Sequence, residues 1–208
     1  MKLYEFAPTR SIRVRWTLQE LRVDFEAISV NLAAGEHHSP EFLRLNPAGR
    51  VPVLVDGGLV LTESVAIVRY LAQKYRDRGF LPAGLEEQAQ LDRWLLFTAT
   101  ELEQPLWRIS KHTFLLPEKD RIPADVDLAS RDFKNVARVM ESHLQNREFV
   151  VGDRVSVADF VLAYTLDWGN EAGLLKEFPK SVAYMENMYT RPHAPPRIRA
   201  ALRSIGMA

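Results

Sequence analysis

The chain has 208 residues, 47% of them hydrophobic and 10% aromatic, which is enough to bury one large core or two cores of about 100 residues each. Lysine plus arginine (27) equal aspartate plus glutamate (27), so no general field favours nucleic acid or an anionic membrane, and neither is an expected partner. The absence of cysteine excludes disulfides, thiolate metal sites and catalysis by a thiol of the protein itself.

No segment approaches the roughly 20 apolar residues that span a bilayer. The first six residues also lack the apolar run of a signal peptide. We therefore expect a cytoplasmic protein.

The first third of the chain alternates strand and helix patterns. The expected elements are strands at 2–6 and 24–30 around a helix at 11–21, a short helix from Ser39-Pro40 to near 45, strands at 53–55 and 59–61, and a helix at 64–75. The turn Asp56-Gly57-Gly58 makes the last two strands a hairpin, whereas the first crossover must be parallel. This order, βαβ-α-ββα, predicts a thioredoxin-like α/β domain at 1–78.

The remainder is predicted to be an all-α domain at 86–208, after a linker at 79–85 that carries two glycines and a proline. Helices are expected at 86–116, 125–144, 157–168, 179–189 and 197–205, with Pro105 breaking or kinking the first. Ser156 and Asp159 have capping-box spacing, which is a structural role. The run 94–97 is apolar on nearly every side, which indicates a second buried face and a homodimer.

Three spaced motifs carry a resemblance to a known family. They are Asn46-Pro47-Ala48-Gly49-Arg50-Val51-Pro52-Val53-Leu54; Leu61-Thr62-Glu63-Ser64 with 67–71; and Gly152-Asp153 with Ser156-Val157-Ala158-Asp159. In this order they resemble soluble, cytosolic-type glutathione S-transferases over essentially the whole chain, as a bacterial-type member of no particular class.

The resemblance implies an enzyme of detoxification that activates glutathione as a thiolate and conjugates it to an apolar electrophile. Glutathione would be a co-substrate, with no permanently bound cofactor. Glutathione-dependent peroxide reduction fits the same site. The alternative is a noncatalytic binding or regulatory module that has kept the fold.

Two motifs are expected to hold the glutathione backbone. Val51-Pro52 resembles the cis-proline of the family, which implies that the Val51 backbone pairs with the cysteinyl unit of the ligand as an added strand does. Glu63 and Ser64 lie where a strand gives way to a helix. The Ser64 hydroxyl and the first free N–H groups would bind the γ-glutamyl carboxylate, and Glu63 its ammonium group.

By the same resemblance, the glycyl carboxylate of glutathione is expected to bind residues that precede the Leu61-Thr62-Glu63-Ser64 motif. His37 and His38 lie in the loop before Ser39, where some classes of the family use His or Lys, and Arg50 precedes the Val-Pro step. We expect no metal site, because two adjacent loop histidines lack ligand spacing and partners.

The group that stabilises the thiolate should follow the first strand, where Thr9, Arg10 and Ser11 compete. Matching the loop to the bacterial cysteine-bearing class places Arg10 at the Cys position with Ser11 beside it, and matching it to insect-type serine enzymes places Phe6 at the Ser position. Tyr4 lies inside the strand and matches the tyrosine classes poorly. Ser11 is also the expected N-cap of the helix.

The pocket for the second substrate should be apolar and largely aromatic. The candidates in the helical domain are Trp107, Phe114, Tyr164 and Trp168.

Overall fold

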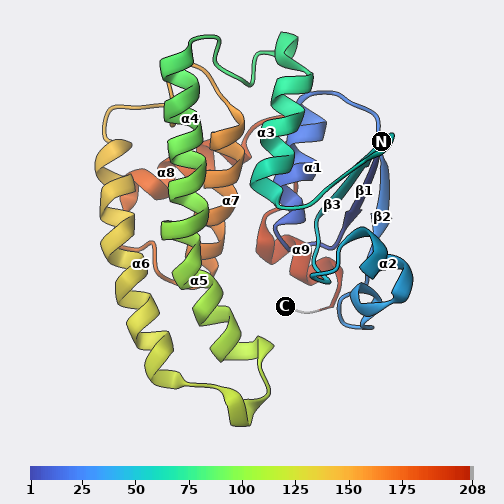
Figure 1. Cartoon of the computed structure of the whole chain (residues 1–208). Helices are drawn as coiled ribbons and strands as arrows, with labels where there is room; N and C mark the ends of the chain where they lie inside the picture. The colour runs from blue at the N-terminus through green and yellow to red at the C-terminus, as the bar shows by residue number, and fades with distance from the viewer. Residues whose placement is uncertain (207–208) are drawn as a thin grey trace. The chain divides into compact units, whose positions relative to one another are not determined.

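The computed structural model describes residues 1–206, which form two compact units that we treat separately. One unit comprises Met1–Leu81 and the chain from Arg191 onward, and the other comprises Pro82–Thr190. Figure 1 shows a small sheet with its helices in the first unit and long helices alone in the second. This confirms the predicted fold class, a thioredoxin-like α/β part with a helical part.

The sheet of the first unit has four strands in the order β2-β1-β3-β4, with bounds β1 Lys2–Glu5, β2 Glu26–Ser29, β3 Val53–Asp56 and β4 Leu59–Leu61. β1 pairs with β2 in parallel and with β3 antiparallel, and β3 pairs with β4 antiparallel. Leu3 of β1 faces Ala27 on one side and Leu54 on the other, and both leucines are fully buried. The core of this unit therefore runs along the central strands.

Three helices accompany this sheet, with bounds α1 Ser11–Glu20, α2 Pro40–Leu45 and α3 Ser64–Lys74. α1 packs against α3, whereas Phe42 of α2 packs with Val30 and Val53 in a separate cluster. α2 begins as predicted, because the Ser39 hydroxyl accepts from the Phe42 N–H at 3.2 Å and Pro40 takes the first helical position.

α1 ends in a Schellman motif. The Val23 N–H donates to the Leu18 carbonyl at 3.1 Å, and the Arg22 N–H donates to the Gln19 carbonyl at 3.0 Å. Arg22 has φ 53°, in the left-handed region that glycine usually fills at this position.

The helical unit contains α4 Leu85–Phe97, α5 Glu103–Ser110, α6 Pro123–His143, α7 Val157–Glu171 and α8 Pro179–Tyr189. The predicted long first helix is divided by a π-helical turn at Thr98–Leu102, just before Pro105. Proline lacks an N–H and its ring crowds the carbonyl four residues earlier, so a widened turn at this point relieves both problems. A second π-helical turn, Lys111–Leu115, follows α5.

α7 is the core of the helical unit and is buried on almost every side, as its apolar sequence predicted. The capping box is present: the Ser156 N–H donates to the Asp159 carboxylate at 2.7 Å. That carboxylate is fully buried and also accepts from the Tyr184 hydroxyl at 2.6 Å. Within the apolar run 94–97, Trp94 and Leu95 are buried and Leu96 is 59% exposed.

The C-terminal segment groups with the first unit rather than with the helical unit to which the sequence pattern had placed it. The Arg191 guanidinium donates from Nε and Nη2 to the two carboxylate oxygens of Glu20 in α1, at 2.6 and 2.8 Å. Further along, Ile198 and Ala201 of α9, which spans Ile198–Ser204, are buried. Helical periodicity identifies α9 but not the unit against which it packs. None of the helices described is long and apolar enough to cross a membrane.

Candidate functional site

The loop from β1 to α1 places Thr9, Arg10 and Ser11 at the helix start, and the hydroxyl groups have different roles from those predicted. Ser11 is the first helical residue, so its hydroxyl points back to the strand and accepts from the Phe6 N–H at 3.4 Å. Arg10 holds the N-cap position and makes no side-chain cap hydrogen bond, while the Ser11 N–H donates to Thr9 Oγ1 at 3.2 Å. The prediction that Ser11 is the N-cap is therefore wrong.

Both hydroxyl protons of this loop are used internally. The Thr9 hydroxyl donates to the Phe6 carbonyl, which can only accept. The Thr9 and Ser11 hydroxyl oxygens lie 2.9 Å apart, which is hydrogen-bond distance. Because the Thr9 proton is already donated to Phe6, the Ser11 hydroxyl is the donor in this bond and Thr9 is the acceptor. Ser11 is also 1% exposed. Neither hydroxyl can donate to a ligand without breaking one of these bonds. The half-buried Arg10 between them has a guanidinium with five N–H donors.

The loop 46–50 and the Val51-Pro52 step form the second part of the site. The Val51–Pro52 peptide bond is cis, and Pro52 is buried. Asn46, 6% exposed, organises the loop: its side-chain amide donates to the Arg50 carbonyl at 2.6 Å, and its side-chain oxygen accepts from the Ala48 N–H at 3.1 Å. Sequence analysis had quoted Asn46 without giving it this role, although asparagine in a turn signals such bonding.

Gly49 brings the two histidines against this loop. It has φ 60°, and a Cβ there would lie 3.1 Å from the His37 carbonyl oxygen and 3.3 Å from His38 Nδ1. The two imidazole rings are 3.9 Å apart between centroids. Burial and the neighbouring His38 lower the pKa of His37, so His37 is neutral at pH 7. The structure thus places the predicted residues His37, His38 and Arg50 around one turn.

The third part of the site is the start of α3. Glu63 has φ 65°, an uncommon backbone conformation for a residue other than glycine, and Ser64 begins the helix with 5% exposure. The Ser64 hydroxyl accepts from Arg13 Nη1 at 3.2 Å. Arg13 is 1% exposed, so a buried guanidinium from α1 lies beside the helix terminus. The free N–H groups of a helix start and an adjacent positive charge are an arrangement that can bind a carboxylate.

Arg13 was missed by sequence analysis. It lies between Ile12 and Val14 in a helix with a weak apolar pattern, where an arginine is normally exposed. No local sequence signal identified it, because its burial follows from the packing of α1 against α3.

The predicted second-substrate aromatics all belong to the helical unit. Tyr164 is 2% exposed and lies in its core, 6.4 Å from Trp168 between ring centroids. The Trp168 indole N–H donates to the Ser110 hydroxyl at 3.2 Å. Trp107 on α5 is half-buried, whereas Phe114 is 61% exposed in the π-helical turn after α5.

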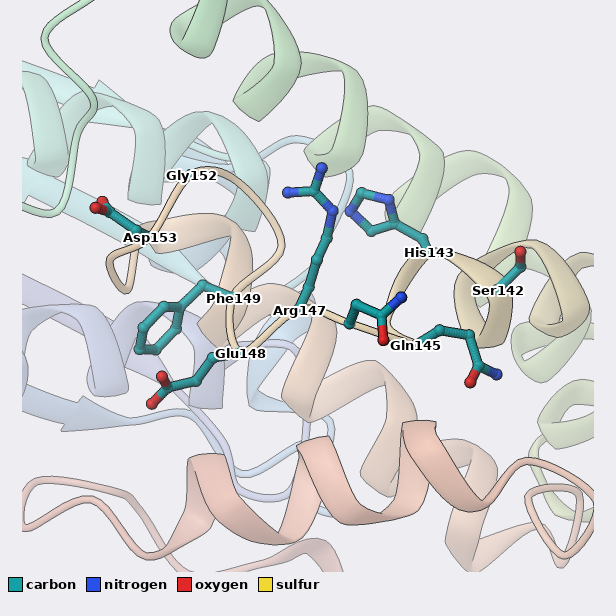
Figure 2. Close-up of a pocket in the computed structure, with 9 residues that line it drawn as sticks. Ser142, His143, Gln145, Arg147, Glu148, Phe149, Gly152 and Asp153 are labelled. Atoms are coloured by element: carbon teal, nitrogen blue, oxygen red, sulfur yellow. The ribbon is translucent and has the colours of Figure 1, made fainter.

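A polar pocket of about 600 Å³ lies elsewhere in the helical unit, at the end of α6. Figure 2 shows the residues that line it, among them His143, Arg147 and Asp153. The His143 ring stacks on Trp94 with centroids 4.0 Å apart. This pocket contains none of the predicted site residues. No group of three or more potential metal ligands occurs among residues 1–206.

Comparison with known proteins identifies the family of the chain. Residues 1–73 match the family described as "Glutathione S-transferase, N-terminal domain", and residues 97–192 match "Glutathione S-transferase, C-terminal domain". The chain belongs to the glutathione S-transferase family.

Individual glutathione S-transferases resemble the chain over most of its length. Glutathione S-transferase F10 of Arabidopsis thaliana is 38% identical over 166 residues, covering 76% of this chain and 77% of that protein. Glutathione S-transferase 4 of Zea mays is 32% identical over 200 residues, covering 93% and 90%. The structure of a sphingomonad glutathione S-transferase complexed with glutathione superimposes with a TM-score of 0.83 at 29% identity, covering 100% of both chains.

Proposed function

We propose that the protein is a glutathione transferase in which Arg10 stabilises the glutathione thiolate. Family membership and glutathione transferase relatives support the general activity. The observation that supports Arg10 is the hydrogen bonding of its neighbours: the hydroxyl protons of Thr9 and Ser11 are already donated within the loop.

The proposed binding mode uses the three parts of the site. The γ-glutamyl carboxylate binds the N–H groups at the start of α3 with the Ser64 hydroxyl, supported by the buried Arg13, and Glu63 binds the ammonium group. The Val51 backbone pairs with the cysteinyl unit. The local positive charge of Arg10 and Arg13 would let a protein of zero net charge bind an anionic ligand.

The glycyl carboxylate is proposed to bind at the turn where His37, His38 and Arg50 meet. Arg50 and His38 are exposed there, while Gly49 allows the two loops to approach. Charge-assisted bonds from this turn would fix the far end of the ligand.

The reaction follows from holding the sulfur as an anion. A free thiol has a pKa near 8.5. At neutral pH the bound thiol loses its proton to solvent, and the sulfur lone pair forms a bond to an electrophilic carbon. The bond from that carbon to its leaving group breaks, and its electron pair departs with the leaving group. Positioning and thiolate stabilisation supply the acceleration.

The remaining parts of the proposal concern the electrophile and assembly. The second substrate would be apolar and would contact Trp107, Phe114 and Trp168, of which Phe114 offers the most exposed ring; the buried Tyr164 would act only by packing beside Trp168. We also propose that the protein is cytoplasmic and forms a homodimer, with Leu96 of the apolar run 94–97, 59% exposed, in the contact between subunits.

The test is the pH dependence of the ultraviolet thiolate absorbance of bound glutathione in the wild type and in the Arg10→Gln and Ser11→Ala variants. One charge-assisted hydrogen bond is worth about 1.5–3 kcal/mol, so we expect Arg10→Gln to raise the pKa of the bound thiol by about 1 to 2 units. Ser11→Ala should leave that pKa nearly unchanged.

A shift caused by Ser11→Ala alone would identify Ser11 as the donor and overturn the role of Arg10. Bound glutathione with an unshifted thiol in the wild type would favour the noncatalytic binding module. Failure of glutathione to bind would contradict the proposed site as a whole.

A further inference from the structure

A second pocket, of about 400 Å³, lies in the first unit at the opposite end of α1 from the loop 7–11. Three segments form it: the C-terminal end of α1, the residues just after α3, and the start of the C-terminal segment at Arg191–His193. None of the residues proposed to bind glutathione lines this pocket.

The charges around the pocket leave it positive. Glu20 is its one lining carboxylate; the Glu20 side chain is 3% exposed and its charge is matched by the two hydrogen bonds from Arg191. Arg22 and Arg78 also line the pocket. Arg22 makes no ion pair or side-chain hydrogen bond with another of residues 1–206, and Arg78 makes only an exposed contact with Asp77 at 3.6 Å. Exposed pairs of this kind are weak, so two guanidinium groups remain for a ligand.

The backbone of Arg22 gives an independent reason to assign its side chain a role. Arg22 occupies the left-handed position of the Schellman motif, which glycine adopts without steric cost and arginine does not. The carbonyls that this motif must satisfy are bonded through the backbone alone, so the fold does not require the guanidinium. Residues other than glycine in such sparsely populated conformations cluster at functional sites, so Arg22 is a candidate functional residue.

The walls of the pocket define the rest of the ligand. Phe80, half-buried, and Pro192 add an aromatic and an aliphatic ring to the lining. The volume is within the range of small-molecule sites. Two planar guanidinium groups match the oxygens and double charge of a phosphate monoester better than the single charge of a carboxylate.

We infer that this pocket binds a small organic phosphate, with the phosphate on Arg22 and Arg78 and a flat apolar group against Phe80 and Pro192. The site is separate from the transferase site and does not depend on the proposed activity. It would give the protein a second anionic ligand whose binding leaves the glutathione residues free.

The experiment is isothermal titration calorimetry of the full chain with phenyl phosphate at constant ionic strength and saturating glutathione. Phenyl phosphate should bind one site per chain, inorganic phosphate more weakly, and phenol not detectably. Arg22→Gly and Arg78→Gln should each weaken phenyl phosphate binding about tenfold or more, since each removes a charge-assisted contact. Arg76→Gln is the matched control, because Arg76 is exposed in the same turn as Arg78 but does not line the pocket.

Three results would overturn the inference. One is the absence of phenyl phosphate binding to the wild type. Another is an equal loss of affinity in Arg76→Gln and Arg78→Gln, which would show a general electrostatic effect instead of a site. The third is binding that occurs without glutathione and disappears when glutathione is added, which would place the anion in the glutathione site. Arg22→Gly keeps the test valid, since glycine suits the backbone at that position.

Discussion

Replacing Arg191 by glutamine should destabilise the first unit, because it removes the cationic partner of a buried carboxylate. The Glu20 side chain is 3% exposed, so the carboxylate cannot be rehydrated without local rearrangement. After the substitution, its remaining described donor is the Trp16 indole N–H, at 3.1 Å.

The expected magnitude follows from the burial of the two partners. Removing one partner of a fully buried ion pair costs about 3–5 kcal/mol. The Arg191 side chain is 26% exposed, so solvent screens part of the interaction and we expect Arg191→Gln to lower the free energy of unfolding by about 2 kcal/mol. For a chain of this size, that corresponds to a fall in the thermal midpoint of about 4–8 °C.

The assay is a double-mutant cycle of thermal unfolding with Glu20→Gln, Arg191→Gln and the double variant. Arg203→Gln is the control, because Arg203 is exposed in the same C-terminal segment. The double variant should lose clearly less stability than the sum of the single variants. Additive losses, or an Arg191→Gln midpoint equal to that of the control, would refute the reasoning.

Three further substitutions test other parts of the structure. Arg22→Gly should raise the thermal midpoint by about 2–4 °C, since glycine relieves roughly 1 kcal/mol of left-handed strain, whereas Arg22→Ala should not. Gly49→Ala should weaken glutathione binding about tenfold in calorimetry, because its Cβ meets the His37 carbonyl oxygen at 3.1 Å; Gly57→Ala, with φ 61° but open surroundings, should leave binding unchanged. Burial, and then neighbouring arginines, lower the pKa of His143 below 6.5 in the folded protein, so folding favours the neutral ring. The contribution of His143 to the stability of the fold is therefore complete above pH 6.5 and is lost as the pH falls towards its folded pKa. His143→Gln should flatten the curve of thermal midpoint against pH in that range.

The fold was largely readable from local patterns. Strand and helix periodicity, the Ser39-Pro40 start and the hairpin turn at 56–58 located the elements of the sheet, and Pro105 marked the interruption of the long helix. Each of these signals acts within a few residues. The grouping of the chain after Arg191 with the first unit depends on a carboxylate 171 residues away in sequence, and no local pattern contains it.

The site was only partly readable for the same reason. The motifs located the 46–54 loop and the start of α3. In both places the candidate site depends on the local backbone conformation, which short sequence motifs specify. The hydrogen bonds that Thr9 and Ser11 make at the start of α1 depend on the direction of each hydroxyl, which the sequence of adjacent polar residues does not reveal. Arg13 looked like an exposed helix residue until α3 was placed against α1, with Ser64 at its guanidinium.

The return of the chain to Glu20 has a consequence for synthesis. In sequence, the helical unit is an insertion within the first unit, because Arg191 and α9 belong with residues 1–81. During translation from the N-terminus, Glu20 is synthesised 171 residues before its guanidinium partner. The first unit is therefore completed last, and a nascent chain that stops before Arg191 has the sheet and the whole helical unit but an unmatched carboxylate at the end of α1.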